Sequence, residues 1–414
     1  MSSKIAAEVA AAAVVVVREY DEETDKRDVE EMERECDETG PPGKPLMVSD
    51  LLGDPVRRVR HFPCHTMLVA EYGEGRKMVG VVRGCVKTVT RGNSIYVKLA
   101  YVLGLRVSPS HRIYDTPRTN IYRNEYDYSS RNLGIGTKLV QTLEEWFKQQ
   151  GATYSYMATD CTNESSINLF TKKCAYIKFR TPTMLVQPVH AHSKPICSDI
   201  TILRLTTKTA ESIYTGVFKD SEFFPSDIDA ILTSRNSLGT FIAFPKEEHG
   251  HKSNRLDRDF PTDYAILSVW STKDVFRLQM KGVSRLTHAC CSGSRLLDSC
   301  MPWMKLPSFP NVFDKFWVYF MYGMHMEGND GPRLMKSLCY FVHNIGRHDE
   351  GCGAVATEIS PLDPVASAVP HWKRLSWAQD LWCLKKLSDE PELSDWSSSK
   401  SSSSNVIFVD PRDI

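Results

Sequence analysis

The chain has 414 residues, of which 42% are hydrophobic and 25% are charged, as is typical of a folded globular protein. This length exceeds what one ordinary core accommodates and favours two domains. Lys plus Arg equals Asp plus Glu, at 51 residues each, so no global field attracts nucleic acid or an anionic membrane. The twelve cysteines are scattered without a C-x-x-C pair, which argues against a zinc site and a secreted disulfide framework.

The beginning of the chain is apolar, but the run Ala10–Val17 is far shorter than the roughly 20 residues that a membrane span requires. We interpret residues 1–13 as a disordered extension and Val14–Arg18 as a first strand, rather than as parts of a secretory signal. A helix over Arg27–Cys36 and a short helix near Val48–Leu52 are expected next. No other targeting signal is evident, so the expectation is a soluble intracellular protein of the nucleus or cytoplasm.

The remainder of the first half predicts an α/β domain over residues 14–190. Strands are expected over Thr66–Glu71, Met78–Thr90, Lys98–Val107 and Ala152–Thr159, with Thr183–Val186 closing the sheet. An amphipathic helix begins at Gly134 and ends near Gly151. Its apolar residues recur at three- and four-residue spacing: Leu139, Val140, Leu143, Trp146 and Phe147.

The segment Arg131–Gly136, R-N-L-G-I-G, opens this helix. Backbone N–H groups at a helix start lack intrahelical partners, and with the helix dipole they attract a phosphate or pyrophosphate. Glycine lets an anion approach the backbone. A P-loop requires Gly-Lys-Ser/Thr, and a dinucleotide fingerprint requires a third glycine; neither is present. The alternative is an ordinary helix start.

Two motifs carry a family resemblance. The spacing Arg-x-x-Gly-x-Gly resembles the acetyl-CoA pyrophosphate loop of the GNAT N-acetyltransferase superfamily. The segment Asn163–Phe170, followed by Ala175-Tyr176, resembles the second signature of that family, Asn-x-x-Ala-x-x-Leu-Tyr and Gly-Phe. Ser166 stands for its alanine and Phe170 for its tyrosine.

Longer segments extend the resemblance over most of residues 14–414. K-L-A-Y-V-L-G-L-R-V-S-P, S-L-G-T-F-I-A-F-P, H-W-K-R-L-S-W-A-Q-D-L-W-C-L-K-K-L and F-V-D-P-R look like the plant Hookless-type probable N-acetyltransferases. The resemblance implies an acetyl-CoA-dependent N-acetyltransferase that acts on a protein or histone amine, in hormone-regulated plant growth such as an ethylene or auxin response. No metal, membrane or direct nucleic-acid binding is expected.

The resemblance also implies which residues bind the cosubstrate. Backbone N–H groups of Leu105 and Val107, at a bulge, would polarise the thioester carbonyl; otherwise these are core residues of a strand. Asn163 would bond to the pantetheine arm, or cap a helix. The full expected set is Leu105, Val107, Arg131, Asn132, Leu133, Gly134, Ile135, Gly136, Thr137, Asn163 and Phe170.

Departures from the family pattern favour a rival interpretation, a catalytically weak or inactive GNAT-fold regulator that acts through acetyl-CoA sensing or partner recruitment. Phe170 has no proton for a leaving thiolate, and Tyr176 is expected to point elsewhere. Glu71 and Asp160 are candidates for a general base, but each is also typical of a surface acid. An unrelated phosphate-binding module is a third interpretation, which requires the second signature to be coincidence.

The family pattern for this loop runs V-x-P-x-x-R-x-x-G-x-G. Compared with it, the chain carries nineteen extra residues, Ile113–Arg131, and their deletion would leave V-S-P-S-H-R-N-L-G-I-G. Either Arg112 or Arg131 is therefore the loop arginine, and we favour Arg131 because it adjoins the glycines. The inserted segment would be a lid, a nucleic-acid contact, a disordered loop or a gene-model artefact.

The second half repeats the order of elements of the first. It predicts strands over Ile200–Leu205, Trp317–Met324 and Ala354–Ile359, helices over Thr209–Phe218 and after Pro332, and a hairpin of Tyr264–Trp270 with Val275–Lys281. We interpret residues 199–388 as a degenerate GNAT-like domain without a cofactor, or as some other α/β domain. Residues 389–414 would be a serine-rich tail with an edge strand over Val406–Val409. The predicted class is α/β (α+β), a mixed twisted sheet flanked by helices, followed by the second domain.

Overall fold

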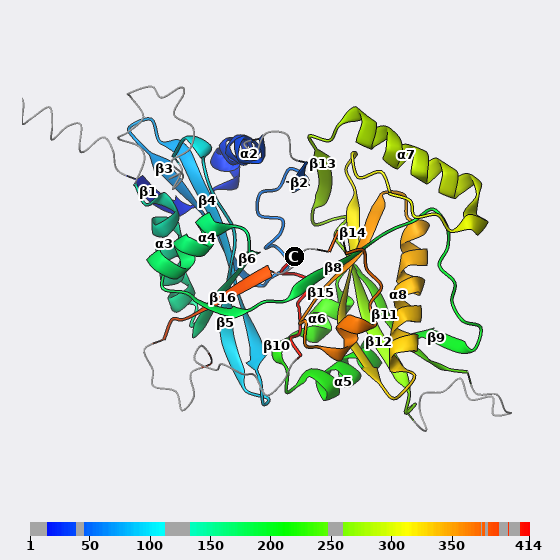
Figure 1. Cartoon of the computed structure of the whole chain (residues 1–414). Helices are drawn as coiled ribbons and strands as arrows, with labels where there is room; N and C mark the ends of the chain where they lie inside the picture. The colour runs from blue at the N-terminus through cyan, green and yellow to red at the C-terminus, as the bar shows by residue number, and fades with distance from the viewer. Residues whose placement is uncertain are drawn as a thin grey trace, which may run out of the picture.

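In the computed structural model the chain forms two lobes, each built on one β-sheet (Figure 1). The structure describes residues 15–38, 45–111, 133–246, 260–373, 375–376, 380–388, 396 and 406–414. The expected extension 1–13, the inserted segment 113–131 and the serine-rich run 397–404 lie outside the described residues. Within the described ranges, every helix is too short or too polar to cross a membrane.

The first sheet has the order β1-β3-β4-β5-β6-β16-β7, and β10 adds to β4. The strands are β1 (Val15–Glu19), β3 (Cys64–Tyr72), β4 (Lys77–Arg91), β5 (Tyr96–Val107), β6 (Tyr154–Asp160), β7 (Ile177–Arg180), β10 (Glu222–Pro225) and β16 (Asp380–Lys386). Helix α3 (Ile135–Gln149) packs on one face and α2 (Glu22–Glu38) on the other. A short helix α4 (Glu164–Asn168) and a π-helical turn η3 (Leu169–Lys173) follow β6.

Parallel pairing occurs at one place in this sheet, between β5 and β6, and α3 connects the two strands. The crossover needs a helix because parallel strands cannot be joined by a tight turn. The apolar stripe predicted for the helix is the face that α3 buries, with Leu139, Leu143 and Phe147 fully inside the core. The predicted strands and helix of this half are therefore confirmed at the level of their type.

The second sheet repeats this arrangement. Its order is β8-β15-β14-β12-β11-β9. The strands are β8 (Thr183–Pro188), β9 (Ile200–Arg204), β11 (Ser237–Pro245), β12 (Tyr264–Ser271), β14 (Trp317–Glu327) and β15 (Cys352–Ile359). The helices of this lobe are α5 (Thr207–Phe218), α6 (Ile228–Thr233), α7 (Arg285–Cys300) and α8 (Gly331–Arg347), with short turns η4 (Pro302–Met304) and η5 (Pro364–Ser367).

Here too the parallel pair, β14 with β15, is connected by a helix, α8. The expectation of a second, GNAT-like α/β unit therefore agrees with the element order and the topology. Strand β14 even has a bulge at the position equivalent to that in β5, described below: Ile266 pairs with His325 but Ser268 pairs with Tyr322. Gly323 inside this bulge has φ +58°, and an added Cβ would lie 2.7 Å from the ring of Tyr214.

The two sheets exchange strands, which the sequence did not predict. The expectation that residues 183–186 close the first sheet is wrong, because β8 pairs antiparallel with β15 of the second sheet. The first sheet is completed instead by β16, which pairs with β6 on one side and with β7 on the other. Figure 1 shows β16 beside β6. The first sheet thus contains β10 and β16, which lie after the predicted boundary at residues 190–199, and the second sheet contains β8, which lies before it. The division of the chain into domains at this boundary stays a prediction.

Two local predictions are also wrong. Residues 46–50 form a strand, β2, rather than a short helix near Val48–Leu52. Strand β13 (Arg277–Lys281) pairs with β2, so the expected hairpin of β12 and β13 does not form. A short apolar run does not distinguish a strand from a helix by periodicity, and its pairing partner depends on which edge is free. The β2·β13 ribbon links the two halves of the chain.

The end of the chain is inserted between the lobes (Figure 1). Residues 406–414 are largely buried, although Ile407 forms only an isolated bridge with Glu222 rather than the expected edge strand. Lys87 of β4 forms ion pairs with Asp410 at 3.2 Å and with Asp413 at 2.5 Å. Arg412 pairs with Asp410 and with Asp227 of the second half. Buried pairs of this kind hold a segment in one place, because removal of one partner leaves an uncompensated charge.

Stability is expected to depend on pH through Glu358 of β15, whose carboxyl accepts a hydrogen bond from Trp382 of β16 at 3.0 Å. Burial raises the pKa of Glu358 from 4.5 to about 8. The folded protein therefore keeps this proton in a range where the unfolded chain has released it, so the free energy of unfolding falls between about pH 4.5 and 8. Glu358→Gln should remove this dependence and stabilise the protein by about 1–3 kcal/mol at pH 8, measured by urea denaturation.

The matched control is Trp382→Phe, which keeps the carboxyl and removes its donor. This variant should lose stability at every pH but retain the decline between pH 4.5 and 8. The prediction would be contradicted if the free energy of unfolding of the wild type and that of Glu358→Gln changed with pH in parallel over this range.

Candidate functional site

Strand β5 contains a β-bulge near its end. Val81 of β4 pairs with Arg106, but Arg83 pairs with Leu103, so β5 has one residue more than its partner between these rungs. Gly104 lies in the bulge with φ +61°, in the left-handed region that favours glycine. An added Cβ at Gly104 would lie 2.8 Å from Nη1 of Arg83. A bulge bends the strand and redirects its backbone groups, as the sequence predicted for the segment that contains Leu105 and Val107.

Beyond the bulge, β5 and β6 separate. Their parallel pairing runs from Leu99 with Tyr154 to Val102 with Met157. Both strands continue past this pairing, β5 to Val107 and β6 to Asp160. The main chain of β5 that bears Leu105 and Val107 is therefore no longer paired with β6. The side chains of both residues pack against the core under α3, so the ordinary structural role also holds for them.

The start of α3 lies against the same strand. Gly134 is the residue before the helix, with φ 62°, and no side chain caps this end among the described residues. An added Cβ at Gly136 would lie 3.2 Å from Leu169 and 3.8 Å from Cγ2 of Val107. The helix start and the bulged strand are thus in direct proximity. Gly134, Gly136 and Thr137 are half-buried, as is Leu133, whereas Ile135 is buried; Arg131 and Asn132 lie outside the described residues.

The second signature is largely structural. The Asn163 side chain accepts from the Ser166 backbone N–H at 3.2 Å and donates to Thr159 at 3.1 Å, so it caps α4. Phe170 is buried, with its ring edge-on to that of Tyr176 at 5.1 Å. The Tyr176 hydroxyl is hydrogen-bonded to Ser155 at 2.8 Å inside the core, and burial raises its pKa far above the usual range. Tyr176 therefore points away from solvent, and neither ring presents a proton at the surface.

The two carboxylates predicted as bases have local partners. Glu71 is buried and accepts from Arg18 at 2.6 Å, in a pair that Arg18 shares with Asp25. It lies on β3, two strands from β5. Asp160 is exposed and accepts from the backbone and the hydroxyl of Thr162, both at 2.6 Å. Within the described ranges no group of three His, Cys, Asp or Glu residues could hold a metal ion.

On the other face of the bulge, helix α2 contributes carboxylates. Arg106, between the two predicted donor residues, pairs with Asp37 and donates to the Glu33 carbonyl, and Arg83 reaches the Glu33 carboxylate at 2.9 Å. The Cys36 thiol lies 3.4 Å from the Val107 carbonyl oxygen. These contacts anchor α2 directly to the bulged end of β5.

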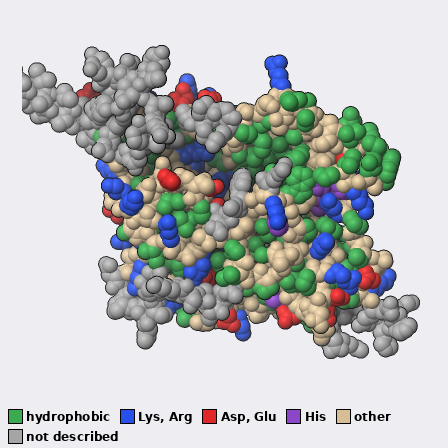
Figure 2. Space-filling model, viewed as in Figure 1, with side chains coloured by type: hydrophobic (Ala, Val, Ile, Leu, Met, Phe, Trp, Pro, Cys, Tyr) green, Lys and Arg blue, Asp and Glu red, His purple; other side chains and the backbone are tan. Residues whose placement is uncertain are grey.

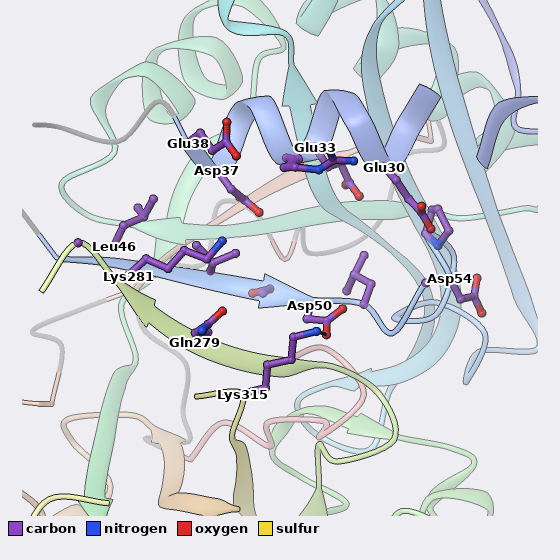
Figure 3. Close-up of a pocket in the computed structure, with 17 residues that line it drawn as sticks. Glu30, Glu33, Asp37, Glu38, Leu46, Asp50, Asp54, Gln279, Lys281 and Lys315 are labelled. Carbon is purple, nitrogen blue, oxygen red and sulfur yellow. Dashed lines mark ion pairs between the residues drawn. The ribbon is translucent and has the colours of Figure 1, made fainter. Parts of the chain in front are cut away.

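A groove of about 650 Å³ lies between α2 and the β2·β13 ribbon (Figure 3). The acidic residues that line it outnumber the basic ones: Glu30, Glu33, Asp37, Glu38, Asp50 and Asp54 against Arg34, Lys281 and Lys315. Lys315 pairs with Asp50 at 2.7 Å. Three more of these carboxylates are ion-paired: Glu33 with Arg83, Asp37 with Arg106 and Asp54 with Arg60. Glu30 and Glu38 are the remaining carboxylates of the lining, and one wall of the groove is the helix that contacts the bulge.

The sequence did not predict a role for Asp413. Its carboxylate Oδ2 accepts from Lys87 at 2.5 Å and from the Tyr156 hydroxyl at 2.6 Å, and its carbonyl accepts from Tyr101 at 3.2 Å. Its Oδ1 is buried and makes no hydrogen bond within the described part of the chain. Burial raises the pKa of Asp413. Tyr101 and Tyr156 face each other across β5 and β6, one rung before these strands separate.

A bulged strand, a diverging parallel neighbour and a glycine-led helix start together define the fold of the GNAT acyltransferases. The sequence model of the family described as "Acetyltransferase (GNAT) family" matches residues 116–176 of this chain. The chain is 44% identical to Probable N-acetyltransferase HLS1 of Arabidopsis thaliana, over 97% of this chain and 100% of that protein. It is 38% identical to Acetyl transferase GW6a of Oryza sativa subsp. japonica, over 97% of each.

The chain therefore belongs to the GNAT acetyltransferase family, among the Hookless-type proteins that include Arabidopsis HLS1, as the sequence motifs predicted. Two solved structures share the fold. Saccharomyces cerevisiae N-myristoyltransferase with bound myristoyl-CoA aligns with a TM-score of 0.50 at 9% identity, over 90% of this chain and 79% of that one. The glucosamine N-acetyltransferase region of a fungal multi-domain GH3 β-N-acetylglucosaminidase also has a TM-score of 0.50, at 14% identity, over 90% and 38%.

The bulge can be tested through Gly104. Gly104→Ala places a Cβ at positive φ and against Arg83, and should destabilise the protein by about 1–2 kcal/mol in urea denaturation. Gly216→Ala is the matched control: this glycine lies within α5 with no atom within 4 Å of the added Cβ, and the change should be neutral or slightly stabilising. Equal effects of the two substitutions would show that Gly104 is not required for the bulge.

Proposed function

We propose that the chain is an acetyl-CoA-dependent N-acetyltransferase that acts on an amine of a protein or peptide. One observation carries the proposal: the glycine-led start of α3 lies beside the bulged end of β5, with the Cβ position of Gly136 only 3.8 Å from Val107. A ligand whose pantetheine arm joins a pyrophosphate to a thioester needs an anion site and an oxyanion site along the same strand.

The described residues fit acetyl-CoA at both sites. Backbone N–H groups at the start of α3 suit a pyrophosphate, because they have no intrahelical partner and lie at the positive end of the helix dipole. Among the described residues, no atom lies within 4 Å of the Cβ position of Gly134, so an anion can approach the main chain there. At the bulge, the backbone N–H groups of Leu105 and Val107 are the candidates to stabilise the developing oxyanion. When bound, acetyl-CoA supplies the acyl group as a thioester.

The acidic groove supports a cationic acceptor. Carboxylates of α2, among them Glu30 and Glu38, line it, and α2 is tied to the bulge through Arg106 and Cys36. A segment rich in lysine, such as a histone tail, complements this lining, and one lysine would then reach the bulge as a neutral amine. The nuclear location and the role in ethylene- or auxin-regulated growth rest on the resemblance to the Hookless-type proteins.

Asp413 is the candidate proton acceptor. Its Oδ1 is buried without a hydrogen bond in the described chain, and burial raises its pKa, so it accepts a proton more readily than a surface aspartate. It contacts Tyr101 and Tyr156, next to the point where β5 and β6 separate. In the transfer, the amine nitrogen forms a bond to the acyl carbon, the C–S bond breaks, and the amine proton leaves to the carboxylate.

One observation favours the second candidate function, a regulator that binds acetyl-CoA without efficient turnover. Phe170 is buried in the core and has no proton for the leaving thiolate, and Tyr176 is engaged with Ser155. Solvent would then have to protonate the thiolate, which makes slow catalysis the alternative to be measured.

Acetyl-CoA binding is measured by titration calorimetry with the full chain. Gly134→Glu/Gly136→Glu adds two carboxylates at the proposed phosphate site and should weaken binding at least tenfold, about 1.4 kcal/mol. Gly75→Glu, in an open turn between β3 and β4, is the control and should bind as the wild type does. Release of free thiol with a lysine-rich peptide distinguishes the enzyme from the regulator, which binds without turnover. No binding by the wild type would overturn both functions.

The role of Asp413 is tested by kinetics. Asp413→Asn should lower kcat at least about 100-fold and remove the acidic limb of the pH profile, while acetyl-CoA affinity stays unchanged. Asp413→Glu should restore part of the rate. Asp410→Asn is the control, because Asp410 is already engaged by Arg412 and Lys87 and should alter stability but not the pH profile. An Asp413→Asn variant with full kcat would contradict the assignment.

A further inference from the structure

Helix α7 of the second lobe packs with its polar side inward. The buried residue of this helix is Asp298, whereas Leu286, Leu296 and Leu297 are each between 50% and 75% exposed. A surface helix ordinarily buries its apolar stripe and exposes its charged residues. The reversed orientation means that the apolar side of α7 contributes little to the core of this chain.

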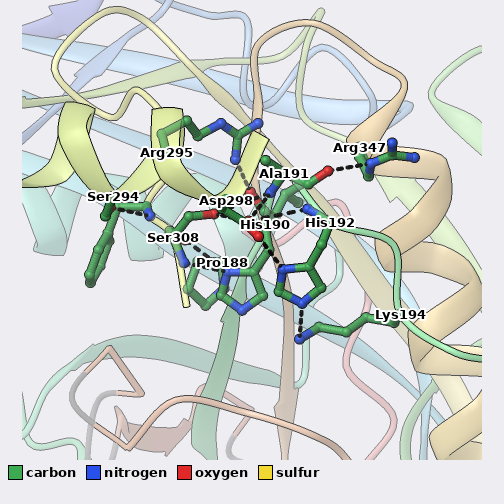
Figure 4. A network of polar contacts seen from close by, with 12 residues as sticks. Pro188, His190, Ala191, His192, Lys194, Ser294, Arg295, Asp298, Ser308 and Arg347 are labelled. Carbon is green, nitrogen blue, oxygen red and sulfur yellow. Dashed lines mark hydrogen bonds and ion pairs between the residues drawn. The ribbon is translucent and has the colours of Figure 1, made fainter. Parts of the chain in front are cut away.

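A polar network holds α7 in this orientation (Figure 4). The Asp298 carboxylate accepts from Nδ1 of His192 at 2.8 Å, from the Ser308 hydroxyl at 2.5 Å and from the Ala191 backbone at 2.9 Å. Arg295 donates to the Val189 carbonyl at 2.5 Å. Rotation of the helix would withdraw the carboxylate and leave its buried donors on Ala191, His192 and Ser308 without this acceptor, which is costly. The leucines are thus kept at the surface.

The exposed apolar surface continues beyond the helix into Trp303 and Met304, which are 72% and 53% exposed. We define the α7 patch as Leu286, Leu296, Leu297, Trp303 and Met304. It contains five of the eleven large hydrophobic side chains that are exposed in the described ranges, within 19 residues of sequence. In Figure 2, hydrophobic side chains gather over the region where Figure 1 shows α7, away from α3. Concentrated exposure of this kind marks an interaction site.

The charges around the patch define its partner. Residues 281–311 contain four basic side chains and a single acidic one, the buried Asp298. Of the basic ones, Arg295 is bound to the Val189 carbonyl and Lys281 lines the groove described above, so Arg285 and Lys305 are the exposed cations beside the patch. The surface of this segment is therefore apolar and cationic. Its complement is an apolar surface flanked by carboxylates.

We propose that the α7 patch docks an acidic amphipathic helix of a partner protein. The helix would place its leucines or aromatic residues against the patch and its carboxylates beside Arg285 and Lys305, in ordinary helix-on-helix packing. An anionic membrane is the less favoured ligand, because basic residues near a membrane contribute only about 1 kcal/mol each and few are exposed here. The proposal is independent of the acetyltransferase site.

The test uses the full chain as bait for a displayed library of 18-residue helices with a fixed apolar stripe and randomised polar positions. Enriched sequences should carry net negative charge. The affinity of the best acidic peptide is then measured by fluorescence anisotropy. It should be at least tenfold weaker for the patch variant Leu286→Asn/Leu296→Asn/Trp303→Asn than for the wild type. It should also be weaker for the charge variant Arg285→Glu/Lys305→Glu. Leu362→Asn, an equally exposed leucine outside the patch, is the matched control and should leave the affinity unchanged.

Several outcomes would overturn the proposal: no enriched peptide, enrichment of cationic peptides, or unchanged affinity in the patch variant. A dimer in sedimentation that the patch variant abolishes would identify a second copy as the occupant instead. Binding to phosphatidylcholine/phosphatidylserine vesicles that is lost in the patch variant would identify a membrane. An unchanged midpoint of urea denaturation in each variant separates loss of docking from loss of folding.

Discussion

The extra residue in β5 is the constraint on which the site depends. Because two residues of β5 oppose one of β4 at Gly104, the strand turns away from β6, and their parallel pairing ends at Val102. The turned segment then runs beside the start of α3, where Gly136 approaches Val107. On its other face, Arg106 and Arg83 bind the carboxylates of α2. One local irregularity thus brings together a candidate anion site, candidate oxyanion donors and the acidic groove.

The lobes are connected by exchange rather than by a simple linker. β16 follows the strands of the second sheet along the chain but belongs to the first sheet. β8 precedes the other strands of the second sheet, within the first half of the chain, but belongs to the second sheet. The segment 406–414 then lies between them, with Lys87 of the first lobe and Asp227 of the second bound to its charged residues. Since each sheet requires a strand from the other half, the lobes are expected to fold and unfold together. The position of Asp413 near β5 and β6 follows from this arrangement.

The second lobe shows how the same topology can be used differently. Its bulge at Gly323 corresponds to that at Gly104, but the ring of Tyr214 lies against it and donates or accepts a hydrogen bond with Ser268 at 2.7 Å. Apolar packing fills this position, whereas the first lobe places the polar side chain of Arg83 there. The distinctive surface of the second lobe is instead α7, held by the buried Asp298 with its leucines outward. These two features support the proposed division between a reaction site in the first lobe and a docking surface in the second.

The sequence alone determined the element types of the first half except at residues 46–50, together with the apolar face of α3, the glycine-led helix start and the family, because these depend on local periodicity and on short motifs. It also indicated the repeat in the second half. The tertiary structure alone decided that β8 and β16 exchange sheets, that β13 pairs with β2, and that Glu71 is engaged by Arg18. It alone brought Asp413 to Tyr101 and Tyr156, and turned Asp298 inward. The physical reason is the same in each case: a pattern of residues specifies a strand, a helix or a charge, whereas its partner is selected by competition among all free edges and buried charges of the folded chain.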